Sequence, residues 1–162
     1  MTERVDFYVL KSSTAMKRQT FACRLTEKAY LRDLSVVVLC DGAAEAAALD
    51  DLLWTFSERS FVPHDLARAD SLQVQAAHGG GSPAGRAVQL TPDLDSVAAA
   101  DLLVNLSARL PAGLERFGRI AEIIDADDER RRLGRERFKS YRDLKLPVET
   151  HQLDEAAGTF RP

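Results

Sequence analysis

The sequence predicts an α/β fold: a single three-layer domain with a mostly parallel central sheet and helices on both faces. Apolar runs typical of strands alternate with segments whose apolar residues recur every three or four positions, as in amphipathic helices. The run Leu34–Cys40 is almost continuously apolar, which is typical of a parallel strand covered on both faces. The 162 residues, 45% hydrophobic and 29% charged, suit one globular domain with its own core.

The first third of the chain predicts two strands and two helices in alternation. Val5–Leu10 is rich in β-branched and aromatic residues and is predicted to be the first strand. Apolar spacing predicts an amphipathic helix over Ala15–Arg32, before the strand at Leu34–Cys40. An alanine-rich segment then predicts a second helix from Asp41 to about Trp54. This order is that of a doubly wound domain.

The middle of the chain is less regular. Gln73–Gln75 and Ala87–Leu90 are predicted to be strands on either side of a glycine-rich loop, His78–Gly85. Asp101–Leu106 is a further candidate for a buried strand. Gly113–Phe117 is interpreted as a short connection or a helical turn.

The last part of the domain is predicted to contain one strand and one long helix. Arg119–Asp125 is expected to be the last strand, and the helix follows over Asp127–Leu144. Acidic residues at the start of this helix suit the positive end of its dipole, and Pro147 marks its end. We expect residues 1–146 to form the domain and 147–162 a C-terminal tail that is a candidate for a flexible segment.

The composition excludes several classes of protein. No apolar stretch approaches the roughly 20 residues that cross a bilayer, so no membrane partner is expected. Cys23 and Cys40 lie within apolar segments and are interpreted as buried, reduced thiols. The N-terminus leads directly into the first predicted strand, without the apolar core of a signal peptide. These features predict a cytoplasmic protein.

The usual nucleotide-binding motifs are missing, although the predicted topology is Rossmann-like. Lys11–Thr14, which follows the first strand, contains no glycine, and the chain has neither a G-x-G-x-x-G turn nor a P-loop. The cluster Gly79–Gly81 leads to Pro83 and does not open a helix. The three histidines are far apart in sequence, and neither cysteine has a partner at metal-ligand spacing. We therefore expect no cofactor, no metal and no catalytic residue.

Charge is distributed unevenly along the chain. The whole chain carries 22 basic and 25 acidic side chains, and its net charge of −3 argues against binding a nucleic-acid backbone through the overall field. From Arg130 to Arg142, however, seven basic residues accompany one acid, Glu136, which is a net of +6. The remainder, with 15 basic and 24 acidic groups, carries −9. The protein is thus an acidic body with one basic helix.

One face of this helix combines basic groups with an aromatic ring. Its members recur at spacings of four, three and four residues, with a lysine alongside: Arg131, Arg135, Phe138, Arg142 and Lys139. Arginine forms planar, bidentate bonds with carboxylates, and a phenyl ring offers a surface to an apolar side chain. The face suits an anionic ligand with an apolar anchor. From these residues alone, a basic face that is simply solvated is an equally open interpretation.

A neighbouring row of the same helix is expected to supply the core. Its members are Leu133, Arg137, Tyr141 and Leu144. The two leucines and the tyrosine are predicted to be buried, because an amphipathic helix packs its apolar face against the sheet.

A second aromatic group lies where the second predicted helix ends. Trp54, Phe56 and Phe61 crowd the end of that helix and the segment after it. They are interpreted either as core residues or as anchors of a protein interface, since aromatic side chains serve both purposes.

Together, these segments resemble the chi subunit family of the bacterial DNA polymerase III holoenzyme. The resemblance rests on the opening strand Phe7–Leu10, on Leu49–Trp54 followed by Ser60–Leu66, and on the block Arg135–Arg142. That block reads Arg-Glu-Arg-Phe-Lys-Ser-Tyr-Arg. The order and spacing of the blocks fit the family over nearly the whole chain.

The resemblance implies a non-catalytic adaptor of the replisome. Members of the family link the clamp loader, through the psi subunit, to the acidic C-terminal tail of single-stranded DNA-binding protein. That tail ends in aspartates, a proline and a terminal phenylalanine with its free carboxylate. The family therefore meets DNA only indirectly and uses no nucleotide.

Carried over by position, the resemblance also implies two sites. The tail-binding pocket would use the basic helix and the end of the preceding strand: Arg131, Arg135, Phe138, Lys139 and Ile124. The psi-facing surface would involve Trp54 and Phe61. Position 138 is Phe where the family often has Tyr, so the resemblance implies ring packing there without a hydroxyl contact.

Two other classes of function compete with the adaptor. The same helix, with Phe138 for base stacking, would suit direct binding of single-stranded nucleic acid, against which the net charge of −3 counts. A small nucleotide-dependent enzyme is the third class, and the missing phosphate-binding motifs count against it.

Overall fold

The computed structural model describes residues 2–11, 15–55, 65–66, 88–97 and 99–153. Its strands are β1 (Arg4–Leu10), β2 (Val36–Leu39), β3 (Asp65–Leu66), β4 (Val88–Thr91), β5 (Ala100–Asn105), β6 (Phe117–Ile124) and β7 (Val148–Leu153). Its helices are α1 (Ala15–Leu31), α2 (Ala43–Thr55) and α4 (Asp128–Asp143), with the short 3-10 turns η1 (Leu94–Ser96) and η2 (Leu114–Arg116). No helix in these ranges is long and apolar enough to cross a membrane.

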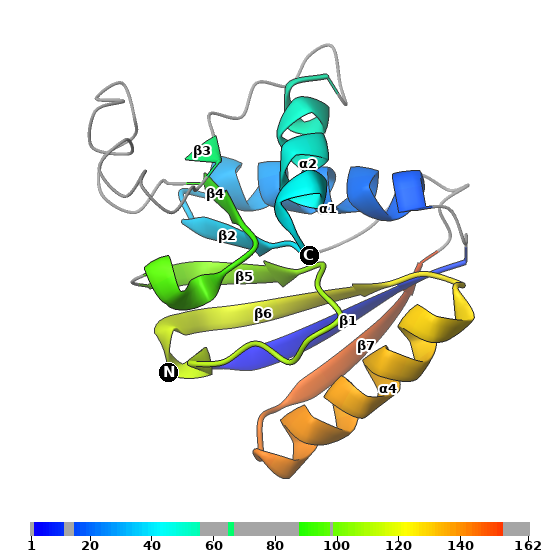
Figure 1. Ribbon diagram of the computed structural model, residues 1–162. Coiled ribbons are helices and arrows are strands. Elements are labelled where there is room, and N and C mark those ends of the chain that lie inside the picture. Colours follow the sequence, from blue (N-terminus) through cyan, green and yellow to red (C-terminus); the bar gives the residue numbers. More distant parts are fainter. Residues whose placement is uncertain (1, 12–14, 56–64, 67–87, 98, 154–162) are drawn as a thin grey trace.

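The described strands form one seven-stranded sheet in the order β3-β4-β2-β5-β6-β1-β7. Every pair of neighbours in this order is parallel. Figure 1 shows α1 and α2 on one face of the sheet and α4 on the other. The predicted three-layer α/β domain with a parallel sheet is therefore confirmed.

The direction in which the chain crosses the sheet decides which face each helix covers. Crossovers between parallel strands are almost always right-handed, so connections that run toward opposite edges lie on opposite faces. From β1 to β2 and from β2 to β3 the chain moves toward the β3 edge, with α1 and α2 in these connections. From β6 to β7 it moves toward the other edge, and α4 accordingly lies on the opposite face (Figure 1).

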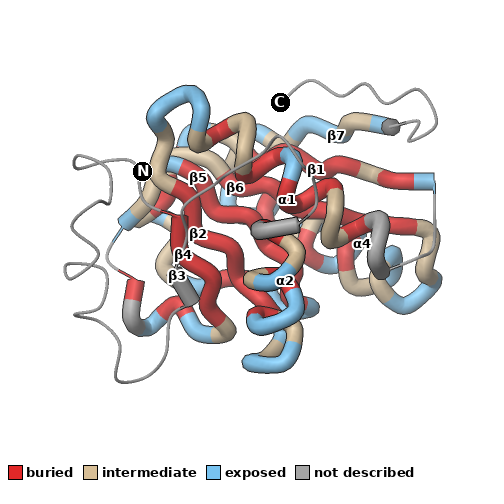
Figure 2. Tube along the Cα trace, turned by 90° about the horizontal axis from the view of Figure 1, so that it is seen from above, coloured by how far each residue is buried: buried red, intermediate tan, exposed pale blue. Residues whose placement is uncertain are grey.

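Side chains that alternate along the strands divide the core into two parts. In β1, Tyr8 and Leu10 pack with residues of α1 and α2, whereas Val5 and Phe7 pack with Tyr141 of α4. All residues of β2 are buried, as the apolar run in the sequence predicts. Figure 2 shows the buried strands at the centre, with the exposed parts of the helices outside them.

Most predicted elements are confirmed with small shifts of their ends. Examples are the first strand and helix, the strand at Ala87–Leu90 and the long helix at Asp127–Leu144. The helical turn considered at Gly113–Phe117 is present as η2. The strand predicted at Gln73–Gln75 and the loop at His78–Gly85 lie outside the described residues.

The prediction that Arg119–Asp125 is the last strand is wrong, because the sheet continues past residue 146 with β7. This strand pairs in parallel with β1, so the tail expected from residue 147 begins as an edge strand of the sheet. His151 on β7 stacks on Tyr8, with ring centroids 5.0 Å apart, and its Nε2 lies 2.9 Å from Oδ1 of Asp6. Four of its six residues are polar, so the segment lacks the apolar pattern by which a strand is predicted from sequence.

A buried network of polar side chains attaches α4 to the sheet. Glu122 on β6 is fully buried and accepts hydrogen bonds from Arg137 Nε (3.1 Å), Tyr141 Oη (2.6 Å) and Asn105 Nδ2 (2.8 Å). Burial raises the pKa of Glu122, and the Arg137 charge and these hydrogen bonds oppose the rise. Nη1 of Arg137 donates to the Ala108 carbonyl oxygen at 3.0 Å. The network thus sets the rotation of α4 about its own axis.

The buried row of α4 differs from the predicted one. Tyr141 is buried as predicted and Leu133 is half-buried, but the prediction for Leu144 is wrong, since this side chain is 56% exposed. Leu144 is the C-cap residue and lies just after the end of α4, the helix that packs on the sheet. Arg137 is buried instead, with 5% of its surface exposed, because Glu122 provides a partner for its charge.

Replacing Arg137 by methionine should lower the free energy of unfolding by about 3–5 kcal/mol, because the Glu122 carboxylate then stays buried without a counter-ion. Urea denaturation measures the loss. Arg132→Met is the matched control on the same helix, since Arg132 pairs with Glu129 and Glu136 at the exposed surface and should contribute much less. Equal losses in the two variants would show that the buried pair does not hold the helix.

Candidate functional site

A groove of about 370 Å³ lies between α4 and the strands β1, β6 and β7. Its lining residues come from all four elements: Phe7, Val9, Ile124, Arg131, Gly134, Arg135, Phe138, Thr150 and Gln152. Four of the five side chains expected in a tail-binding pocket are therefore brought together here. The fifth, Lys139, is exposed on α4 and does not line the groove.

Local interactions place the first turn of α4 beside the end of β6. Asp127 is the N-cap, and its side chain accepts a hydrogen bond from the backbone N–H of Arg130 at 2.9 Å. Asp128 and Glu129 occupy the first turn, where negative charge is stabilised by the helix dipole. Because β6 ends at Ile124, only a few residues separate the strand from the helix, and both border the groove.

Gly134 allows the strand and the helix to approach closely. A Cβ atom at this position would lie 2.7 Å from Cδ1 of Ile124, so an alanine would displace the isoleucine side chain. Both residues line the groove. A glycine inside a helix costs about 1 kcal/mol relative to alanine, which is a sign in the sequence that backbone proximity is needed there.

Acidic residues neutralise three of the seven basic side chains on this helix. The pairs are Arg130 with Asp125, Arg132 with Glu129 and Glu136, and Arg137 with Glu122. Within the described part of the chain, no carboxylate pairs with the other four: Arg131, Arg135, Lys139 and Arg142. The uncompensated charge therefore belongs to the groove residues Arg131 and Arg135 and to two side chains farther along the helix.

Asp125, which follows β6, holds two arginines of the first turn of α4 in place. Its buried carboxylate accepts hydrogen bonds from Arg130 Nε (2.8 Å) and Nη2 (2.6 Å). Burial acts to raise the pKa of Asp125, but the bonds from Arg130 and from the Asp127 N–H outweigh it and lower that pKa. Its backbone carbonyl accepts a bond from Arg131 Nε at 3.2 Å, which positions that guanidinium.

Phe138 provides the aromatic surface of the groove. The half-buried ring packs edge-on against Phe7, with centroids 5.2 Å apart, as part of the core under α4. Cζ of Arg142 lies 6.0 Å from the centroid of the Phe138 ring. The groove thus places an aromatic ring and an isoleucine beside two uncompensated guanidinium groups, an arrangement that suits binding an anion with an apolar group.

Five groove residues were not expected from the sequence: Phe7, Val9, Gly134, Thr150 and Gln152. Thr150 and Gln152 were not predicted to line the site because β7 itself was not predicted. Residues two apart in a strand share a face, so Thr150 and Gln152 face the groove, whereas His151 lies on the other face, where it stacks on Tyr8. No alternation in the sequence would have predicted this, because Glu149–Gln152 are all polar.

The second expected site lies at the edge of the described residues. The backbone of Trp54 belongs to the last turn of α2. Phe61, like Phe56, lies outside the described residues. The psi-facing surface therefore stays a prediction.

One group outside the groove has the composition of a metal site. Asp6, Glu149 and His151, on neighbouring strands, place one candidate ligand atom each within 4.8 Å of one another. Asp6, however, already accepts hydrogen bonds from Arg119 Nη2 (2.9 Å) and Arg4 Nε (3.2 Å). Two guanidinium groups at this carboxylate oppose the approach of a further cation. We interpret the group as an ion-pair network that attaches β7 to the sheet.

Two solved structures share the fold at low sequence identity. The C-terminal domain of the DEAD-box protein Dbp5 matches with a TM-score of 0.59 and 11% identity, over 93% of this chain and 91% of that one. Mss116p DEAD-box helicase domain 2, bound to an RNA duplex, matches with a TM-score of 0.54 and 11% identity, over 95% and 66%. At this identity the likeness concerns the fold alone.

The sequence comparisons are more specific. The family described as DNA polymerase III chi subunit, HolC, matches residues 1–149. The DNA polymerase III subunit chi of Pseudomonas aeruginosa is 35% identical over 150 residues, which are 93% of this chain and 96% of the relative. That of Escherichia coli is 26% identical over 145 residues, or 86% and 91%. These matches confirm the resemblance drawn from the motifs, and the chain belongs to the DNA polymerase III chi subunit family.

Proposed function

We propose that this protein is a non-catalytic adaptor that links the clamp loader, through psi, to the acidic C-terminal tail of single-stranded DNA-binding protein. Membership of the chi family makes it a component of the replisome. The observation that supports the tail assignment is the groove beside α4, where Arg131, Arg135, Phe138 and Ile124 meet. In this role the protein is cytoplasmic and meets DNA only through its partners.

The groove is chemically complementary to a tail of aspartates, proline and a terminal phenylalanine. Ile124 and Phe138 provide the apolar surface that the terminal ring needs. Arg131 and Arg135 stand beside that surface and suit the free carboxylate of the same residue, since guanidinium binds carboxylate through paired hydrogen bonds. Lys139, exposed farther along the helix, suits the aspartates that precede it.

The charge distribution favours a short acidic peptide over a nucleic-acid strand. A phosphate backbone is bound by many cations spread along its path. On α4, acidic partners neutralise three of the seven basic groups, and the rest of the protein carries a net charge of −9. A small basic groove on an otherwise acidic protein therefore favours a short acidic peptide whose end binds in the groove over a long phosphate backbone.

Arg135→Glu should weaken binding of the acidic tail peptide by about 30-fold or more, because a guanidinium that contacts the ligand carboxylate is replaced by a like charge. Isothermal titration calorimetry measures the affinity, which should also fall with rising salt. Arg132→Glu makes the same change in net charge on the exposed, paired side of α4 and should alter the affinity only slightly.

Two outcomes would contradict this assignment. Equal affinities of Arg135→Glu and Arg132→Glu would show that the groove is not the site. If fluorescence anisotropy instead gave tight binding of a single-stranded oligonucleotide without any peptide signal, direct nucleic-acid binding would replace the adaptor.

Gly134→Ala should weaken binding of the same peptide several-fold without a loss of helix content. The added Cβ displaces Ile124 in the groove, whereas alanine favours the helix itself. Gly42→Ala is the matched control, because a Cβ at Gly42 meets no atom within 4 Å and the residue does not line the groove. Calorimetry and circular dichroism report affinity and helicity. Unchanged tail affinity in Gly134→Ala would exclude Ile124 from the binding surface.

The double variant Trp54→Ala/Phe61→Ala should lose the contact with psi and keep the affinity for the tail peptide. Aromatic anchors carry much of the energy of a protein interface, and α2 lies on the opposite face of the sheet from α4 (Figure 1). A pull-down with psi and calorimetry with the peptide measure the two contacts separately. If the double variant unfolds, the two residues belong to the core and the interface assignment fails.

A further inference from the structure

The edge strand β7 ends beside the groove that α4 borders. Gln152 pairs with Val9 of β1, and Val9 pairs in turn with Ile124 of β6, so β7 ends level with the strand that leads into α4. Figure 1 shows the end of β7 near the first turns of α4. Residues 154–162 follow β7 and lie outside the described residues. The family match, over residues 1–149, does not account for them.

This C-terminal segment, residues 154–162, combines two acids with one aromatic ring. Asp154 and Glu155 come first, and Phe160 follows them. The tail peptide proposed as the ligand of the groove has the same two parts, acids followed by a phenylalanine. Arg161 leaves the segment with a net charge of only −1, so the segment is the weaker ligand of the two. The chain thus contains a segment that resembles the proposed ligand of its own groove.

The alternation of side chains along β7 predicts that the first acid of the segment faces the groove. Thr150 and Gln152 line the groove, and residues two apart in a strand share a face. The next position in this series is Asp154. The described lining of the groove includes Arg131 and Arg135 but no acid, and no carboxylate of the described residues pairs with either arginine. An acid at position 154 therefore faces two uncompensated guanidinium groups.

The segment is long enough for its aromatic ring to reach the apolar part of the groove. Phe160 comes seven residues after Leu153, and an extended chain spans about 3.3 Å per residue, or about 23 Å. On α4 the lining residues extend from Arg131 to Phe138, about 10 Å along the helix axis at 1.5 Å per residue. The ring can therefore lie against Ile124 while the acids stay near the arginines.

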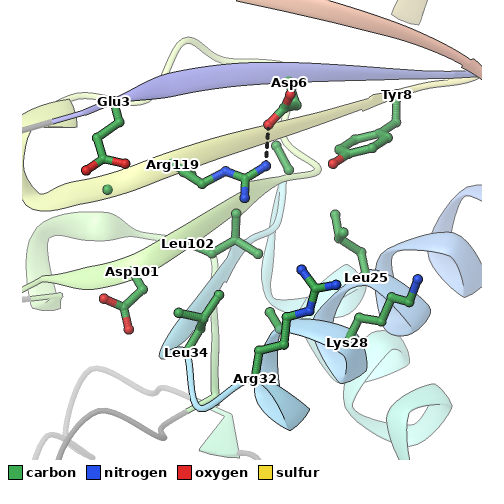
Figure 3. A pocket seen from close by; sticks show the side chains of 13 residues that line it. Glu3, Asp6, Tyr8, Leu25, Lys28, Arg32, Leu34, Asp101, Leu102 and Arg119 are labelled. Carbon is green, nitrogen blue, oxygen red and sulfur yellow. Dashed lines mark hydrogen bonds and ion pairs between the residues drawn. The ribbon is translucent and has the colours of Figure 1, made fainter. Parts of the chain in front are cut away.

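The pocket on the opposite face of the sheet, shown in Figure 3, lacks this charge imbalance. Its volume is about 210 Å³, and its lining balances three acids against three bases: Glu3, Asp6 and Asp101 against Lys28, Arg32 and Arg119. Figure 3 shows Asp6 and Arg119 joined in an ion pair, with a distance of 2.9 Å between Oδ2 and Nη2. An acidic segment is therefore attracted to the groove and not to this pocket.

We propose that the C-terminal segment docks in the groove of its own chain and competes there with the acidic tail peptide. The inference concerns regulation of the same site, so it rests on the proposed function. Phe160 packs against Ile124, and Asp154 meets Arg131 and Arg135. Because the segment is joined to β7, its effective concentration at the groove is on the order of millimolar, which offsets a weak intrinsic affinity. A tail peptide must displace the segment, so the observed tail affinity is lower than that of the free groove.

Methyl NMR of the full-length protein tests the contact without any peptide. The chain contains three isoleucines, of which Ile124 lines the groove, whereas Ile120 and Ile123 are fully buried and do not line it. Phe160→Ala removes the ring current that acts on the Ile124 δ1 methyl group, so this signal should move while the other two stay. Thr159→Ala is the matched control and should move none of them. An unmoved Ile124 signal in Phe160→Ala, or an equal shift in Thr159→Ala, would overturn the proposal.

Protein concentration distinguishes a contact within one chain from a contact between two copies. For the internal contact, the difference in the Ile124 signal between wild type and Phe160→Ala should be the same at every protein concentration. A difference that disappears on dilution would place the segment in the groove of a second copy and overturn the internal contact.

Calorimetry with the same two variants separates this proposal from the proposed function. Phe160→Ala should bind the acidic tail peptide about 3- to 10-fold more tightly than the wild type, because a competitor at about 1 mM effective concentration, with an intrinsic Kd of about 0.1–0.5 mM, is removed. Thr159→Ala should bind as the wild type does. Unchanged tail affinity in Phe160→Ala would overturn the competition and leave the tail assignment intact. Absence of tail binding by Phe160→Ala would instead contradict the proposed function itself.

Discussion

The buried ion pair between Glu122 and Arg137 determines which face of α4 the protein presents. Removing two charges from water is costly, so a buried ion pair adds little net stability to a fold. Its consequence in this protein is that it fixes the orientation of α4. At 100° per residue, Arg135 and Lys139 lie nearly opposite Arg137 on the helix, and Phe138 lies between the inward and outward sides. With Arg137 held inward, the aromatic ring borders the groove and Lys139 points away from it.

Neutralisation by neighbours gives the basic helix its selectivity. A count of charges treats all seven basic residues of the helix as equivalent. In the folded protein, Asp125 pairs with Arg130 and Glu122 pairs with Arg137, and acidic residues at the surface pair with Arg132. What is left of the positive charge lies at the groove and along the outer face of the helix. An acidic peptide that ends in the groove matches this distribution better than an extended phosphate backbone does.

Edge strand β7 shows how an element with little apolar content becomes part of a site. Its four central residues, Glu149–Gln152, are all polar, so the strand lacks the continuous apolar run that predicted β2. Its place is decided by contacts with β1, namely the backbone pairing and the position of His151 between Tyr8 and Asp6. Through Thr150 and Gln152, β7 then forms one side of the groove that α4 borders on the other.

The sequence by itself determined the layer architecture, most of the helices and strands, and the helix face that carries the candidate site. Periodicity and charge are local properties of the chain, so they are visible without the fold. Only the tertiary structure decided that Arg137 is buried and Leu144 exposed, that Gly134 makes room for Ile124, and which arginines are neutralised. The partners of Arg137 and Gly134 are Glu122 and Ile124 on β6, ten or more residues away, and no local pattern specifies such pairings.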